Sequence, residues 1–441
     1  MQEQGKRKKS LFDWATSELS QDAVLLWLLD NKKVNKEVLG NLLCRNIKGE
    51  KVDNSLPYGI KEILEPKKQE HHVDISVEFT DQNEKKHIVL IEDKTETELH
   101  DQQMIKYIAG IPVGYEYIHF VLFKTGLFSF VEQERFELES NAISTALKGE
   151  LELPAHVSKK DEERVNKYLD TIKDMKRKEI SFHLFIPDSF DDICDKNNFS
   201  AGWKDEYIEF FKTIIDKRKD DERNGFSSFL SKREYSSEQF SKVIGLEGRK
   251  EIKGVFIRPN NGGGKRTYDF LILGFCGDNK YNNEDLKNRY YIKPIILFSE
   301  KKDCSVEATI IMHFSWQVDG KKSNDLSNYL PYAKLNEEQQ KNFKETRSVL
   351  DEFFEGKREE RLTEKEKEKK ERLQVYRSGK IQINKPEEID SYKVLVNPLK
   401  ELLGYCDELN KQISHAEDAK DLRKRLKLPE SKKKEEQFSL R

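Results

Sequence analysis

The stretch "KKHIVLIEDK", residues 85–94, is the strongest structural signal in the sequence. Five apolar or near-apolar residues, His87 to Ile91, run directly into Glu92, Asp93 and Lys94. A strand that is apolar on both faces is typical of the centre of a sheet. Placing three charged residues at the end of such a strand costs burial energy unless they are used. The stretch therefore predicts a central strand that ends in functional side chains.

The flanking segments predict the rest of the sheet. "HHVDISVEFT", residues 71–80, alternates with Val73, Ile75, Val77 and Phe79 on one face and Asp74 on the other, which indicates a half-buried strand. Residues 59–66 and 115–126 also have strand patterns. Residues 10–30, 35–47 and 98–111 have helical patterns. This order predicts an α/β fold, a mixed sheet flanked by helices.

The remaining chain predicts helical and small β-rich extensions. We expect a core over 1–135, a helical region over 136–250, a β-rich unit over 251–333 and a charged helical region over 334–441. Leu362 and Leu373 are the only apolar residues of the run 356–373. Such a run cannot bury a normal apolar stripe, so we expect a solvated helix or a connector there.

Composition argues against several classes of protein, among them disulfide-rich, zinc-binding and membrane-spanning proteins. The chain has 441 residues, of which 36% are hydrophobic and 36% charged, and its net charge of −2 gives no overall signal for polyanion binding. The five cysteines are far apart and none forms a CxxC pair, which argues against a zinc site or a disulfide framework. No apolar run approaches the ~20 residues of a membrane span, and the N-terminus is not signal-like. We therefore expect a cytoplasmic protein with no membrane partner.

The chemistry is concentrated at the end of the central strand. Residues two apart on a strand share a face, so Glu92 and Lys94 point together and Asp93 points away. If the two preceding strand patterns form a hairpin, Asp74 converges on Glu92 with Lys94 beside them. Two close carboxylates repel each other unless a cation lies between them, and oxygen ligands suit Mg²⁺ or Mn²⁺. A lysine beside such a metal can orient a water, so the set suits phosphodiester hydrolysis.

The order of these residues resembles the PD-(D/E)XK nuclease superfamily. The motif reads Val73-Asp74 and then Glu92-Asp93-Lys94, with valine where the family name has proline. Gln103 and Tyr107, four residues apart, resemble the Gln-x-x-x-Tyr element of the RecB-like branch.

The first helix adds to this resemblance, which covers roughly residues 10–125. "ATSELSQDAVLLWLL", residues 15–29, is similar to the first helix of a bacterial set in the superfamily, where a helix glutamate often completes the metal site. Glu18 is the matching residue.

The resemblance implies a restriction-endonuclease-like core and a Mg²⁺-dependent endonuclease, with Mn²⁺ as an alternative ion and DNA as substrate. It implies Asp74, Glu92 and Glu18 as metal ligands, and Lys94, Gln103 and Tyr107 as further catalytic residues. Such domains with helical extensions often act in bacterial antiviral defence, beside a sensor or ATPase subunit. A homo-oligomer is a further alternative for the assembly of the chain.

Several of these residues have plainer interpretations. Gln103 and Tyr107 would also fit one polar face of a helix, and Glu18 a charge near a helix N-terminus. His71 and His72 lie near Asp74, but adjacent strand residues face opposite ways, so we expect surface or turn histidines.

Two basic segments are candidates for phosphate contacts. Lys265 and Arg266 follow "RPNNGGG", which lacks phosphate-loop spacing and is expected to form a flexible hairpin. Arg423, Lys424 and Arg425 lie in a basic stretch near the C-terminus. The rival hypothesis is a nuclease fold that serves as a non-catalytic scaffold and binds DNA or a partner protein.

Overall fold

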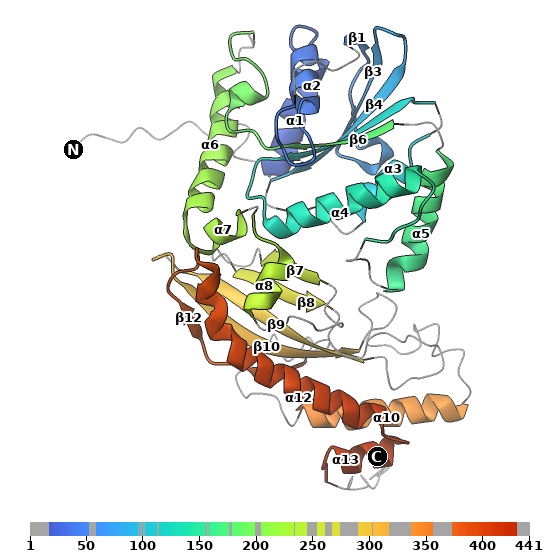
Figure 1. Ribbon diagram of the computed structural model, residues 1–441, viewed down its shortest axis with the longest axis vertical. Helices are drawn as coiled ribbons and strands as arrows, with labels where there is room; N and C mark the ends of the chain where they lie inside the picture. The colour runs from blue at the N-terminus through green and yellow to red at the C-terminus, as the bar shows by residue number, and fades with distance from the viewer. Residues whose placement is uncertain are drawn as a thin grey trace, which may run out of the picture. The chain divides into compact units, whose positions relative to one another are not determined.

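In a computed structural model (Figure 1), the chain folds into two compact units, Met1–Ser237 and Glu238–Arg441. It describes residues 17–52, 59–95, 97, 99, 102–112, 114–154, 157, 159–175, 179–198, 204–232, 234–244, 254–260, 267–273, 290–301, 303–316, 337–355 and 373–429.

The first unit is built on a mixed sheet of six described strands in the order β1-β3-β4-β5-β6, with β2 beside β3 (Figure 1). The strands are β1 (Ile60–Ile63), β2 (Lys67–Lys68), β3 (Ile75–Asp81), β4 (Lys86–Lys94), β5 (Tyr117–Lys124) and β6 (Glu179–Phe185). The strands β1, β3 and β4 pair antiparallel, whereas β4, β5 and β6 run parallel. The predicted α/β class with a mixed sheet is confirmed.

Helices cover both faces of this sheet. The helices α1 (Ser17–Asp30), α2 (Asn35–Leu43) and α6 (Lys204–Arg223) share one apolar core with residues such as Val89, Ile91 and Phe123. The helices α3 (Gln103–Ala109), α4 (Phe130–Leu147) and α5 (Lys159–Asp174) share the other core with Leu90 and Phe120. Because β4 is covered on both faces, its residues from His87 to Lys94 are all buried. The short elements η3 (Phe190–Asp192) and α7 (Gly225–Leu230) complete the unit.

The strand expected over residues 71–80 begins later, at Ile75. The chain before it forms a short 3-10 turn, η2 (Glu70–His72). Gln69, His71 and His72 have left-handed backbone conformations, which cannot continue a strand. Val73 therefore packs in the core beneath α3, whereas Ile75 packs in the core beneath α1. The prediction that Val73 shares a face with Ile75 is wrong for this reason.

The predicted boundary at residue 135 does not match the structure. The expected helical region 136–250 contains β6, which pairs in parallel with β5 from Tyr117 to Phe123. The helices α4 and α5 also contribute buried residues such as Phe136 and Leu169 to one core of the first sheet. These contacts make residues up to Ser237 part of the first unit.

The second unit contains an antiparallel sheet in the order β11-β10-β9-β8-β7, with β12 also paired to β10. Its strands are β7 (Gly254–Asn260), β8 (Thr267–Leu273), β9 (Tyr290–Glu300), β10 (Val306–Trp316), β11 (Leu373–Arg377) and β12 (Ile381–Ile383). The short helix α8 (Ser237–Val243) precedes them. The expected β-rich unit over 251–333 is present, but two of its strands come from beyond residue 333.

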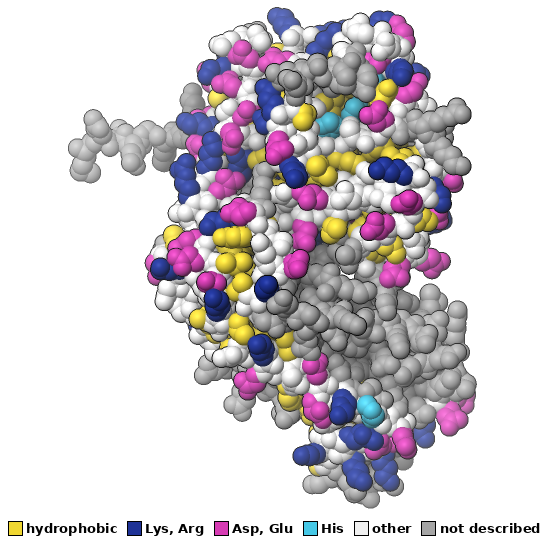
Figure 2. Space-filling model, viewed as in Figure 1, with side chains coloured by type: hydrophobic (Ala, Val, Ile, Leu, Met, Phe, Trp, Pro, Cys, Tyr) yellow, Lys and Arg dark blue, Asp and Glu magenta, His cyan; other side chains and the backbone are white. Residues whose placement is uncertain are grey.

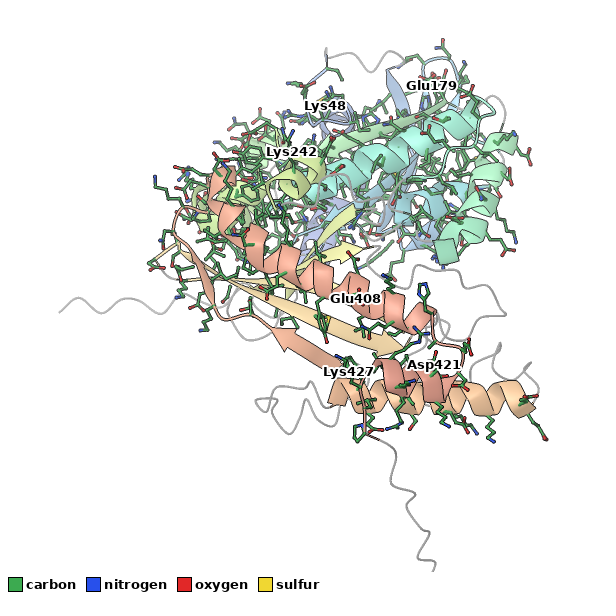
Figure 3. The ribbon with its side chains drawn as sticks, turned by 60° about the horizontal axis from the view of Figure 1, so that its bottom comes forward. Lys48, Glu179, Lys242, Glu408, Asp421 and Lys427 are labelled. Atoms are coloured by element: carbon green, nitrogen blue, oxygen red, sulfur yellow. The ribbon has the colours of Figure 1, made fainter. Side chains whose placement is uncertain are left out.

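The C-terminal region is therefore not a separate helical region. Its elements α10 (Glu337–Glu355), η6 (Ile389–Leu395), α12 (Val396–Ser414) and α13 (Ala419–Arg425) belong to the second unit. On α12 the side chains of Leu402 and Leu409 are buried, while Tyr405 and Glu408 are exposed; Figure 3 labels Glu408. Leu373, expected in a charged helix, begins β11 because the alternating sequence from Leu373 to Arg377 suits a strand paired with β10. The rest of that charged run, 356–372, lies outside the described residues.

Candidate functional site

The last three residues of β4 point to alternate faces of the sheet, as expected for a strand. Glu92, Asp93 and Lys94 are 1%, 2% and 7% exposed, so all three are buried beside β3 and β5. Glu92 and Lys94 lie on the side of α3, whereas Asp93 lies on the side of α1. This geometry creates two buried polar clusters, one on each face.

The predicted convergence of Asp74, Glu92 and Lys94 is present in the structure. Lys94 Nζ lies 2.5 Å from Glu92 Oε1 and 3.9 Å from Asp74 Oδ2. Asp74 directly precedes β3, and its Oδ2 accepts a hydrogen bond of 2.9 Å from the backbone N–H of Asp93. The antiparallel pairing of Ile75 with Ile91 brings the two carboxylates to the same end of the sheet.

Gln103 and Tyr107 join this cluster from α3. Gln103 Nε2 donates to Glu92 Oε1 at 2.5 Å and to the Tyr107 hydroxyl at 2.5 Å. Residues four apart on a helix lie on the same side, which explains the second contact. The two residues therefore contact the end of β4 instead of forming a solvated helix face.

The electrostatics of the cluster centre on Glu92. Burial raises the pKa of Glu92 to about 7, with a further rise from Asp74 that Lys94 and Gln103 oppose. Burial and then the charge of Glu92 raise the pKa of Tyr107. Glu92 can therefore exchange a proton near neutral pH, which is typical of functional sites.

The second cluster, on the opposite face, was not predicted. Gln21 Nε2 donates to Asp93 Oδ1, and Thr125 Oγ1 donates to Gln21 Oε1 at 2.6 Å. Burial and then the carboxylates of Asp22 and Asp74 raise the pKa of Asp93 well above its ordinary value. The available signal was the pair of polar residues Gln21 and Asp22 inside an apolar helix. Glu18 lies one turn earlier in α1, and its side chain is outside the described part of the chain.

A third group of buried charges holds the segment between β4 and α3. Lys124 Nζ donates to Thr97 O at 2.7 Å and lies 3.2 Å from Glu132 Oε1. Arg135 Nη1 donates to Leu99 O at 2.6 Å.

The same group reaches the first turn of α3. Gln102 N donates to Glu139 Oε1 at 2.7 Å, and Arg164 Nη2 donates to Gln102 Oε1 at 2.9 Å. Glu132, Arg135 and Glu139 follow each other at helical spacing on a buried side of α4, a pattern that was visible in the sequence. The group fixes where Gln103 enters the cluster around Glu92.

The first cluster fits a divalent cation through its oxygen donors. Glu92 Oε2 is buried and accepts no hydrogen bond from the described residues, although it is a strong acceptor. Together with Asp74 it offers the one or two carboxylates with which proteins usually hold Mg²⁺. Within the described ranges no three His, Cys, Asp or Glu side chains form a complete metal-ligand group. His71 and His72 lie in the η2 turn, as expected for turn residues.

The predicted phosphate contacts come from other segments of the chain. Lys265 and Arg266 lie outside the described residues. Arg423, Lys424 and Arg425 lie on α13 of the second unit, where Lys424 is exposed. Arg423 Nη1 donates to Glu352 Oε1 at 3.0 Å, and Arg425 Nε donates to Asp421 Oδ2 at 2.7 Å. Two of the three basic side chains therefore already have acidic partners, which leaves Lys424 as the best candidate for phosphate binding.

The face of the molecule seen in Figure 2 shows basic and acidic side chains interspersed. Among the described residues, no helix combines the length and the apolar character that crossing a membrane requires. No family model, no curated protein and no solved structure matches the chain.

Proposed function

We propose that the protein is a Mg²⁺-dependent nuclease that hydrolyses phosphodiester bonds in DNA at the cluster of Asp74, Glu92 and Lys94. One observation carries the proposal: Asp74, directly before β3, converges with Glu92 and Lys94 at the end of β4, where burial raises the pKa of Glu92 to about 7. Burying these groups costs free energy that packing alone does not explain. A catalytic role explains why they lie together.

Each side chain has a role that follows from its contacts. Asp74 and Glu92 would hold the cation, which supplies charge neutralisation at the phosphate and a lowered pKa for a bound water. Lys94 Nζ is a donor that can hold the attacking water or a phosphate oxygen. Gln103 orients Glu92 by donating to Oε1, and its bond to Tyr107 holds its amide in place.

The pKa of Glu92 makes cation binding proton-linked. A carboxyl group with a pKa of about 7 carries a proton in a large fraction of molecules at neutral pH. A divalent cation would displace that proton, because its charge favours the carboxylate. The proposal therefore implies that binding of Mg²⁺ releases protons near pH 7.

The setting of this activity is also proposed. We place the nuclease in the cytoplasm, as an effector of bacterial defence that works with a sensor or ATPase subunit. The described cysteines Cys44, Cys194, Cys304 and Cys406 are free, which is compatible with a reducing compartment. The exposed Lys424 would add a salt-sensitive contact to phosphates.

The test is cleavage of supercoiled plasmid by the full chain with Mg²⁺ and with a chelator. We expect cleavage only with the cation. Glu92→Gln should abolish it, because an amide is a poor ligand for Mg²⁺ and cannot replace the carboxylate.

Asp93→Asn is the matched control on the adjacent residue. Asp93 is equally buried but contacts Gln21 on the opposite face, so cleavage should stay close to that of the wild type. No cleavage and no Mg²⁺ binding by the folded wild-type protein would refute the proposal and favour the scaffold hypothesis. Equal loss in both variants would refute the assignment of Glu92.

A further inference from the structure

A chain of polar side chains crosses the first sheet at the end opposite to Glu92. His87, His119 and His183 lie on the neighbouring strands β4, β5 and β6, and all point to the side of α1 and α2. They are 0%, 6% and 8% exposed, and Asp81 at the end of β3 is 0% exposed. Three buried histidines in one row are not needed by the proposed nuclease chemistry.

The contacts form one continuous path. His87 Nδ1 lies 3.0 Å from His119 Nε2, and His119 Nδ1 lies 2.6 Å from Ser181 Oγ. Ser181 Oγ lies 2.9 Å from His183 Nε2, and His183 Nδ1 lies 2.7 Å from the carbonyl oxygen of Arg45. At the other end His87 Nε2 lies 3.6 Å from Asp81 Oδ2.

Both ends of this path can only accept hydrogen bonds. The carbonyl oxygen of Arg45 has no proton to give. Asp81 is buried, but its Oδ1 accepts from the backbone N–H groups of Asn83 and Lys85, at 2.8 Å and 2.9 Å. These two bonds hold the pKa of Asp81 below its ordinary value despite its burial, so it is a carboxylate.

The histidines between the two ends are neutral at neutral pH. Burial lowers the pKa of His87 and lowers that of His183 to about 4. Burial and then the neighbouring His183 and His87 lower the pKa of His119 well below its ordinary value.

Counting protons then shows that the path is one proton short. Neutral His87, His119 and His183 and the hydroxyl of Ser181 each bring one proton, which gives four protons for five contacts. The four contacts from His87 to Arg45 have hydrogen-bond lengths, while the contact between His87 and Asp81 is longer. The missing proton therefore belongs between His87 Nε2 and Asp81 Oδ2. All three histidines then carry their proton on Nδ1.

We propose that the contact between His87 and Asp81 is a buried proton-binding site of the sheet. A proton taken up on His87 Nε2 completes the path and forms an ion pair with Asp81. His119 and His183 cannot bind a proton without breaking a contact, since their free nitrogen lone pairs already accept from His87 and Ser181. His87 is therefore the first of the three to become charged as the pH falls.

The surroundings of His87 are compatible with this role. Its ring stacks between Phe79 and Tyr117, with centroid separations of 4.3 Å and 4.4 Å. Besides Asp81 and His119, the groups that act on it include Glu116, whose charge favours the protonated form, and Lys85, whose charge opposes it.

The test uses the full chain labelled with ¹⁵N-histidine, because long-range ¹H–¹⁵N spectra report which ring nitrogen holds the proton. At about pH 7.5 we expect His87, His119 and His183 to be neutral and protonated on Nδ1. On acidification His87 should gain its second proton before His119 and His183 do. Each histidine signal is assigned by its loss when that histidine is substituted. The exposed His415 provides the signal of a histidine outside this path for comparison in the same spectra.

Asp81→Asn is the decisive variant. Its amide oxygen keeps the acceptor for Asn83 and Lys85, and its NH₂ group can donate to His87 Nε2, so that this contact becomes a hydrogen bond without uptake of a proton. We expect the pKa of His87 to fall by at least about one pH unit. We also expect the melting temperature at neutral pH to match or exceed that of the wild type, whereas Asp81→Ala should lower it.

Three results would overturn the proposal, and each can be read without a destabilised variant or any nuclease assay. The first is a neutral His87 protonated on Nε2 in the wild type. The second is a His87 that already carries both protons at about pH 7.5. The third is an unchanged titration of His87 in the Asp81→Asn protein.

Discussion

The ammonium group of Lys94 has two proposed roles at the end of β4: it keeps Glu92 ionised, and it holds the attacking water or a phosphate oxygen. Replacing Lys94 by methionine should separate these two roles. Methionine keeps most of the apolar stem, which matters because the side chain is 9% exposed. The substitution removes the ammonium group that lies 2.5 Å from Glu92 Oε1. Glu92 then stays buried beside Asp74 without its nearest positive charge.

The size of the effect follows from that contact. A hydrogen bond between charged groups contributes about 1.5–3 kcal/mol, which corresponds to roughly one to two pH units in the pKa of the acid. The pKa of Glu92, about 7 in the wild type, should rise accordingly. Breaking a buried ion pair usually costs about 3–5 kcal/mol, but Glu92 can bind a proton at pH 7 at little cost. We therefore expect the free energy of unfolding to fall by only about 1–2 kcal/mol.

Cleavage should fall much further than stability. Loss of a positioned proton-transfer or charge-stabilising group typically costs about 10²–10⁴-fold in rate. The raised pKa of Glu92 should add about a further tenfold at pH 7, because fewer molecules carry the carboxylate. Raising the pH should recover this tenfold but not the larger loss.

The assay is plasmid cleavage with Mg²⁺ over a range of pH, with urea unfolding as the check on the fold. A folded Lys94→Met protein that cleaves nearly as fast as the wild type would refute the role of Lys94. Full recovery at high pH would show that Lys94 acts only by keeping Glu92 ionised.

Three further outcomes follow from the same geometry. Titration calorimetry should show Mg²⁺ affinity falling by about tenfold per pH unit below pH 7, since Glu92 must lose its proton to bind the cation, and a flat profile would contradict this. Glu139→Ala should slow cleavage in the wild type but add little in a Gln103→Ala background, because Glu139 acts through the start of α3; additive losses would contradict this. A chain that ends at Ser237 should keep one cooperative thermal transition. A chain that ends at residue 333 lacks β11, β12 and α12, so its second sheet should be exposed, and calorimetry should show no cooperative transition for that second unit.

Local sequence patterns were enough to predict the central sheet and the arrangement of its candidate site. The apolar run before Glu92 predicted the buried strand β4, and the period of two predicted that Glu92 and Lys94 share a face. The helical spacing of Gln103 and Tyr107 predicted that they act together. These features depend on local periodicity, which a strand or helix imposes wherever it lies in the fold.

Which segments lie side by side could be seen only in the folded chain. Sequence patterns did not assign β6 to the first sheet or β11 and β12 to the second, because a strand's partners depend on pairing between distant segments. The start of β3 was also misjudged, since the left-handed residues before it carry no glycine signal.

The buried polar clusters were beyond sequence patterns for the same physical reason. Asp22 lies 71 positions before Asp93, and the path from Asp81 to Arg45 joins the four strands β3 to β6 and the segment after α2. In a sequence, a charged residue or a histidine predicts a surface position, because these residue types are seldom fully buried. Only the pairing of β3 with β4, β5 and β6, together with the packing of α1 on the sheet, brought these side chains together, where hydrogen bonds between distant residues offset the cost of burying them.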